Sequence, residues 1–228
     1  MDKHERQFDR DLGNLKNRLI HMAAVAETMI DKAIGELVSR DEAIGQQIPE
    51  YEEELNALQI DIDEEVMTLL ATQQPVANDL RFIVTASKIN GELERIGDLV
   101  INITENVHVL AHQPALKPLI DIPRMADLAR KMTRDALESF AREDVLLAQT
   151  VILTDDQVDA LKDQIIRELL TYMMADPTTI ERALALILVA RHLERIADHA
   201  TNIAQDVIYL VQARDVRHPR LKRDKPPL

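Results

Sequence analysis

The sequence has no cysteine and no tryptophan, and its 228 residues include only five glycines. Without cysteine, disulfides, thiol chemistry and soft-metal sites are excluded. No glycine-rich loop is present to hold a phosphate, which removes support for a nucleotide-binding enzyme. The longest purely apolar run, residues 183–190, is far too short to span a bilayer. The charged N-terminus contains no apolar signal core. These absences predict a soluble, cytoplasmic protein without membrane insertion.

Acidic residues outnumber basic ones, and the formal net charge is −13. A nucleic-acid-binding surface needs clustered lysine and arginine, so we expect no nucleic-acid partner. The one basic segment is residues 214–228, where six Lys/Arg stand against two Asp. We interpret it as a disordered, solvated tail. The alternative is a basic handle for an acidic partner or for peripheral association with a membrane surface.

Abundant Ala, Leu, Ile, Glu and Arg favour an all-α fold. Apolar residues at heptad spacing from Phe8 to Ala33 predict a long first helix, which should end near Val38. Ser39 and Glu42 then have the spacing of a capping box that starts a second helix. Three helices, a proline-containing linker and three more helices predict two tandem repeated three-helix bundles with up-down topology. The predicted parts are residues 1–113, the linker 114–123, residues 124–213 and the tail 214–228.

One segment occurs twice: LERIGDLVIN starts at Leu93 and LERIADHATN at Leu193. Over eighteen positions from each leucine, nine residues are identical at an offset of 100. On a helix that turns about 100° per residue, Glu94 and Asp98 share one face and the apolar residues lie opposite. Two carboxylates four residues apart repel by about 0.2–0.5 kcal/mol, so a merely solvated face has no reason to repeat them. The repetition predicts a positive group at each of these acidic stripes.

The positive group is either an arginine or a metal ion, and the residues leave both open. Arg95 and Arg195 recur with the stripes and could bridge to a neighbouring helix. Carboxylate and amide oxygens suit a hard cation, divalent or trivalent, such as Mg, Mn or Fe. One helix offers too few ligands, so a neighbouring helix must contribute. Glu65 and Glu168, at matching places on the second and fifth helices, are candidates.

The repeated segments, with QPVANDLRFI ahead of the first and DVRH near the end, resemble the PhoU family. The resemblance covers about residues 8 to 218. It implies two three-helix bundles side by side and negative regulation of phosphate uptake and of phosphate-starvation signalling. The implied partners are the ATPase subunit of a phosphate ABC transporter, a phosphate-sensing histidine kinase and a second copy in a homodimer. The implied metal-site residues are Glu94, Asp98, Asn102, Glu194, Asp198 and Asn202.

The competing prediction is a metal-buffering protein or a di-metal carboxylate enzyme built on a helical bundle. Such an enzyme needs Glu-x-x-His on two helices. The chain has this motif at Glu105 and His108, but its repeat reads Gln205 and Ile208. The sequence therefore favours a non-enzymatic regulator that holds cations at its duplicated Glu-x-x-x-Asp motifs.

Overall fold

The structure is a computed structural model that describes residues 3–217, and within that range it contains helices and no strand. The long helices are α1 (Lys3–Ser39), α3 (Ile48–Gln73), α4 (Ala77–Ala111), α5 (Asp121–Arg142), α6 (Val145–Ala175) and α7 (Ile180–Gln212). A single turn, α2 (Glu42–Gly45), precedes α3, and a 3-10 turn, η1 (Pro177–Thr179), precedes α7. The predicted all-α fold is confirmed. Most of the predicted tail, residues 218–228, lies outside the described residues.

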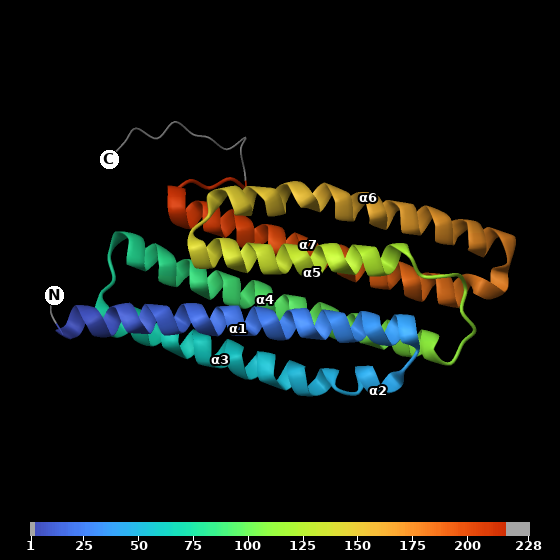
Figure 1. Cartoon of the computed structure of the whole chain (residues 1–228), viewed down its shortest axis with the longest axis horizontal. Coiled ribbons are helices and arrows are strands. Elements are labelled where there is room, and N and C mark those ends of the chain that lie inside the picture. The colour runs from blue at the N-terminus through green and yellow to red at the C-terminus, as the bar shows by residue number, and fades with distance from the viewer. Residues whose placement is uncertain (1–2, 218–228) are drawn as a thin grey trace.

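The helices run along the long axis of the molecule in two groups (Figure 1). One group contains α1, α3 and α4, and the other contains α5, α6 and α7. The two groups lie side by side and meet where α4 packs along α7 and α1 along α5. The chain directions of α4 and α7 are opposite, and the linker between the groups lies at the end where α1 finishes and α7 starts. None of the described helices is long and apolar enough to cross a membrane.

The heptad seam predicted for the first helix forms the inner face of α1. Its central members are fully buried: Leu15, Leu19, Met22, Ala26, Met29 and Ala33. Equivalent rows on the other helices join them in one continuous core. Helical periodicity alone therefore identified this part of the core, as expected for an amphipathic helix whose stability comes from packing.

The predicted capping box at Ser39 is wrong. The hydroxyl of Ser39 donates to the Gly35 carbonyl, and Asp41 instead caps α2 by accepting from the Ala43 amide. A helix does start at Glu42, but it is not continuous, because α2 ends after one turn and α3 restarts at Ile48 with a proline in its first turn. A proline is tolerated there because the first turn of a helix lacks intrahelical amide partners.

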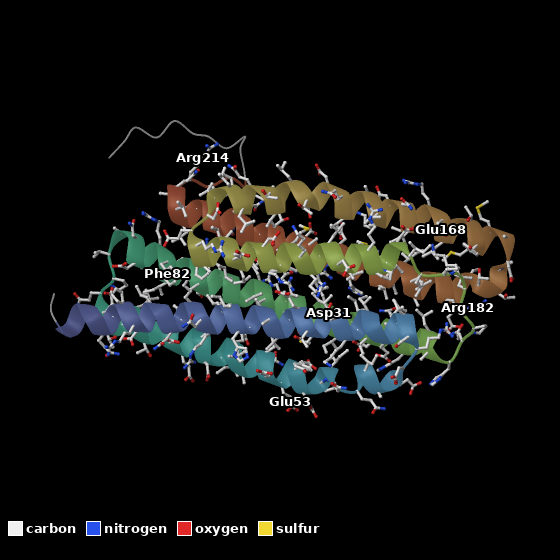
Figure 2. The ribbon with its side chains drawn as sticks, viewed as in Figure 1. Asp31, Glu53, Phe82, Glu168, Arg182 and Arg214 are labelled. Atoms are coloured by element: carbon white, nitrogen blue, oxygen red, sulfur yellow. The ribbon has the colours of Figure 1, made fainter. Side chains whose placement is uncertain are left out.

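Polar and aromatic contacts join the two groups of helices. Arg130 on α5 donates to Asp31 on α1 at 2.8 Å, and Figure 2 shows Asp31 toward the C-terminal end of α1. Phe82 on α4 stacks on Phe140 of α5 with ring centroids 5.1 Å apart. Such offset ring pairs add about 0.5–1.5 kcal/mol to the burial of their surface. The groups are thus held together along α1 and α5 as well as along α4 and α7.

Candidate functional site

The second acidic stripe lies on α7 and faces two aspartates of α6. Glu194 and Asp198 come from α7, and Asp155 and Asp159, which have the same four-residue spacing, come from α6. Between the helices stands Lys162, whose Nζ is 2.8 Å from Asp159 Oδ1 and 3.0 Å from Glu194 Oε1. Two of the four carboxylates therefore bind one ammonium group, and Asp155 and Asp198 lie near enough to interact electrostatically with this cluster.

Burial and neighbouring negative charge both raise the pKa of carboxyl groups in this cluster. Burial and then the charges of Asp198 and Asp159 raise the pKa of Asp155 to about 6. Burial, followed by the charge of Glu194, also raises the pKa of Asp198. The pKa of Lys162 is raised, chiefly by its hydrogen bond with Asp159. Burial is the larger cause of these raised carboxyl pKa values and repulsion between carboxylates is the second, and an additional cation would relieve the repulsion.

The first acidic stripe lies on α4 beside α3. Gly97 lies between the two acids of this stripe, and a Cβ there would stand 3.1 Å from the Leu55 side chain of α3. Burial and the neighbouring Asp98 charge raise the pKa of Glu94. At an offset of 103, the position of Lys162 is taken by Gln59 in the first half. The two halves therefore share the acids of the stripe but not the lysine.

The two asparagines of the predicted site make different contacts. Asn102 Nδ2 donates to the Asp98 backbone carbonyl at 2.9 Å, within its own helix. Asn202 Nδ2 donates across to Glu92 of α4 at 3.2 Å, and His199 Nδ1 lies 2.6 Å from the same Glu92 oxygen. Burial alone would raise the pKa of Glu92, but the hydrogen bonds from His199 and Asn202 outweigh it and the pKa is lowered. Asn202 thus takes part in a polar contact between the two groups of helices.

The predicted contribution of Glu65 and Glu168 to the stripes is wrong. Glu65 pairs with Arg18 of α1 at 3.2 Å, and Glu168 pairs with Lys117 of the linker. On α6, Glu168 is nine residues past Asp159, which corresponds to about 13 Å along the helix. The residues that face the second stripe are the two aspartates of α6, and their four-residue spacing was visible in the sequence.

The structure also bears on the choice between arginine and metal. In residues 3–217, the side chain that pairs with the second stripe is Lys162, whereas Arg95 and Arg195 are exposed and form no ion pair. In the same range, no three His, Asp or Glu side chains converge closely enough to enclose a metal ion as they stand. The donor types nevertheless suit a hard cation, because all four groups are carboxylates and two of them already bind an ammonium group.

Comparison with known proteins agrees with this duplicated arrangement. The PhoU domain family model matches residues 19–107 and again residues 122–207, once in each group of helices. The chain is 40% identical to the phosphate-specific transport system accessory protein PhoU homolog of Pseudomonas putida, over 95% of this chain and 85% of that protein. It is also 40% identical to the homolog of the same name from Aquifex aeolicus, over 93% of this chain and 96% of that protein.

Solved structures show the same fold. The crystal structure of PhoU from Pseudomonas aeruginosa matches with a TM-score of 0.87 and 37% identity, over 91% of this chain and 100% of that one. The phosphate transport system regulatory protein PhoU from Streptococcus pneumoniae matches with a TM-score of 0.84 and 27% identity, over 92% and 99%. The resemblance seen in the repeated segments is confirmed, and the chain belongs to the PhoU family.

Proposed function

We propose that this chain is an accessory protein that regulates phosphate uptake and phosphate-starvation signalling by binding other proteins in the cytoplasm. The observation that supports this most strongly is the match of the PhoU domain to both halves. Relatives that align over nearly the whole chain carry the name of accessory proteins of phosphate-specific transport. The proposed partners are the ATPase subunit of a phosphate ABC transporter and a phosphate-sensing histidine kinase, and the proposed working form is a homodimer.

The proposal includes cations at the two acidic stripes. In the second half the ligands would be Glu194 and Asp198 together with the α6 aspartates, once Lys162 has moved aside. In the first half they would be Glu94 and Asp98, and no lysine competes there. A bound Mg, Mn or Fe ion would supply positive charge that links neighbouring helices. Raised pKa values at both stripes support this, because after burial their next cause is the charge of the neighbouring carboxylate, which a cation would offset.

The regulatory part is tested by deleting the gene and measuring a phosphate-starvation reporter in phosphate-rich medium. The reporter should become active, and the wild-type gene on a plasmid should silence it again. Unchanged repression in a strain that also lacks any second copy of the gene would refute the regulatory function. The reporter separates this function from a metal-buffering role, in which the deletion would alter metal tolerance and leave the reporter silent.

The binding and metal parts need separate measurements. The tagged protein should retain a phosphate transporter ATPase or a histidine kinase from solubilised membranes. A variant in which a charged surface residue outside the acidic stripes is replaced should serve as the reference. Metal analysis of purified wild-type protein should find an oxygen-ligated metal that is lost from the double variant Glu94→Ala, Glu194→Ala. A metal-free wild-type protein that still retains its partners would leave the acidic stripes without a cation-binding role.

A further inference from the structure

A cavity lies where the linker crosses the end of the bundle, away from both acidic stripes. Its volume is about 220 Å³, and it is bounded by the ends of α1 and α4, by the linker and by the start of α7. Most of its wall is aliphatic: Leu37, Val107, Leu110, Leu116, Leu119 and Leu186. Because Leu186 belongs to the second group of helices and Leu37 to the first, a ligand in this cavity would contact both halves.

One wall residue is a buried carboxylate without a hydrogen-bond partner. Glu36 of α1 is 1% exposed, and neither of its oxygens has a hydrogen-bond partner. The nearest basic atom is His108 Nε2, 3.5 Å from Glu36 Oε1, which is too long for a good hydrogen bond. Burial is the main cause of the raised pKa of Glu36. Burying a carboxylate without a hydrogen-bond partner is costly, so the presence of Glu36 here indicates a ligand that donates the missing hydrogen bond.

The other charged residues of the wall already contact polar or charged groups of the protein. Arg40 Nη1 donates to the Gln113 carbonyl at 2.6 Å. Lys117 is 7% exposed and pairs with Glu168, which Figure 2 places near the same end of the molecule. Glu42 lies 3.6 Å from His112 at the rim. Arg40 and Lys117 therefore have hydrogen-bond partners, whereas the inner carboxylate has only the long contact with His108, so the group that the cavity lacks is a cation.

We propose that this cavity binds a small aliphatic amine, with its ammonium group against Glu36 and its hydrocarbon body among the leucines. A cavity of about 150 Å³ accommodates benzene, so this one holds a ligand of about six to nine non-hydrogen atoms. The ammonium group would donate to an oxygen that now has no partner, and the alkyl chain would fill apolar space. The site is separate from the acidic stripes that are proposed above to bind metal ions.

The ligand's charge is tested with three probes of the same length: n-hexylamine, n-hexanol and hexanoate. Calorimetric or NMR titration of the full chain should show the amine binding at least about tenfold more tightly than the alcohol, since a charge-assisted hydrogen bond is worth a factor of this size or more. Hexanoate should bind most weakly. The amide signals of Leu110 and Leu186 should move on titration.

Glu36→Gln keeps the shape of the side chain and removes its charge. This variant should lose the tenfold preference for the amine while its affinity for n-hexanol stays the same. Equal binding of amine and alcohol by the wild-type protein, preference for hexanoate, no binding of any probe, or an amine preference that survives Glu36→Gln would each overturn the proposal.

A second variant displaces the Glu36 carboxylate without changing Glu36 itself. A Cβ at Gly45 would overlap with the Glu36 carboxylate, so Gly45→Ala must displace that flexible group. It should weaken amine binding, whereas Gly91→Ala, where a Cβ meets nothing within 4 Å, should leave it unchanged. Amine binding that is equally strong in both glycine variants would contradict the assignment of Glu36 as the ammonium partner.

Discussion

Replacing Lys162 by glutamine should turn the α6–α7 cluster into a site whose stability depends on an added cation. The ammonium group of Lys162 pairs with Asp159 and Glu194, and the Lys162 and Glu194 side chains are 20% and 24% exposed. Hydrogen bonds to charged partners are worth about 1.5–3 kcal/mol when buried, and exposed ion pairs less than about 1 kcal/mol. At this intermediate exposure we expect metal-free Lys162→Gln to lose about 1–2 kcal/mol of unfolding free energy, which lowers Tm by about 2–8 °C.

Metal affinity should change in the opposite direction. A cation that enters the wild-type cluster must first displace the ammonium group, and a cost of about 1.4 kcal/mol corresponds to a tenfold weaker affinity. Lys162→Gln should therefore bind Mn²⁺ at least about tenfold more tightly at this cluster, which calorimetry on chelator-treated protein would measure. At a free concentration of about 100 times Kd, the ion should restore about 2.7 kcal/mol of stability.

Lys131→Gln is the matched control. Lys131 pairs with Asp135 on the same helix, and its side chain is 63% exposed. It should change neither Mn²⁺ affinity nor Tm appreciably. If Lys162→Gln loses stability but gains no affinity for Mn²⁺, the four carboxylates do not form a cation site. If it loses no stability, Lys162 does not neutralise the cluster, and the reasoning from its two contacts fails.

Glu92→Gln should lower unfolding free energy at neutral pH by about 1–2 kcal/mol, because the charge-assisted contact with His199 is lost. Since the pKa of Glu92 is lowered, denaturation curves of variant and wild type should converge only in strong acid. The folded protein favours the neutral form of Asp155, whose pKa is about 6. Protonated Asp155 therefore stabilises the folded state in acid, and this contribution is lost as pH rises through 6. Metal-free Asp155→Asn should therefore gain about 1–3 kcal/mol above pH 6 and almost nothing near pH 4, in chemical denaturation at both pH values. Gly97→Val should cost about 1–3 kcal/mol in the same assay, because its side chain must displace Leu55 in a packed interior.

Helical periodicity was sufficient to predict the fold, because every long helix buries one continuous apolar face. The spacing of Glu94 and Asp98 likewise placed them on a common face. What periodicity could not predict is the neighbour that each face meets. Asp159 and Glu194 are 35 positions apart in the sequence, and their approach depends on the register between α6 and α7. Register is set by packing along the whole helix pair, so matching places in the sequence wrongly suggested Glu168.

The prediction of the cap between the first two helices failed for a local reason. Ser39 and Glu42 satisfy the spacing of a capping box, but Asp41 lies between them and is an equally good capping residue. The structure uses Asp41, and the proline that follows Ile48 then restarts the helix. Where two capping residues compete within one turn, the residue chosen depends on how the flanking helices pack. Short-range rules of this kind therefore locate an interruption but not the residue that makes it.

The difference between the halves gives a reciprocal test of the cation hypothesis. Gln59 of α3 holds the position that Lys162 holds in α6, and only its backbone carbonyl is used, as an acceptor for Asn90. Gln59→Lys should bring an ammonium group to Glu94, as Lys162 brings one to Glu194. It should raise metal-free stability by about 1 kcal/mol and weaken Mn²⁺ binding in the first half about tenfold. Opposite effects of Gln59→Lys and Lys162→Gln on Mn²⁺ affinity would show that lysine and metal compete for the same carboxylates. If Gln59→Lys raises stability and leaves Mn²⁺ binding unchanged, the acids of the first stripe are not ligands, since an ammonium ion and a metal ion cannot both occupy the space between them.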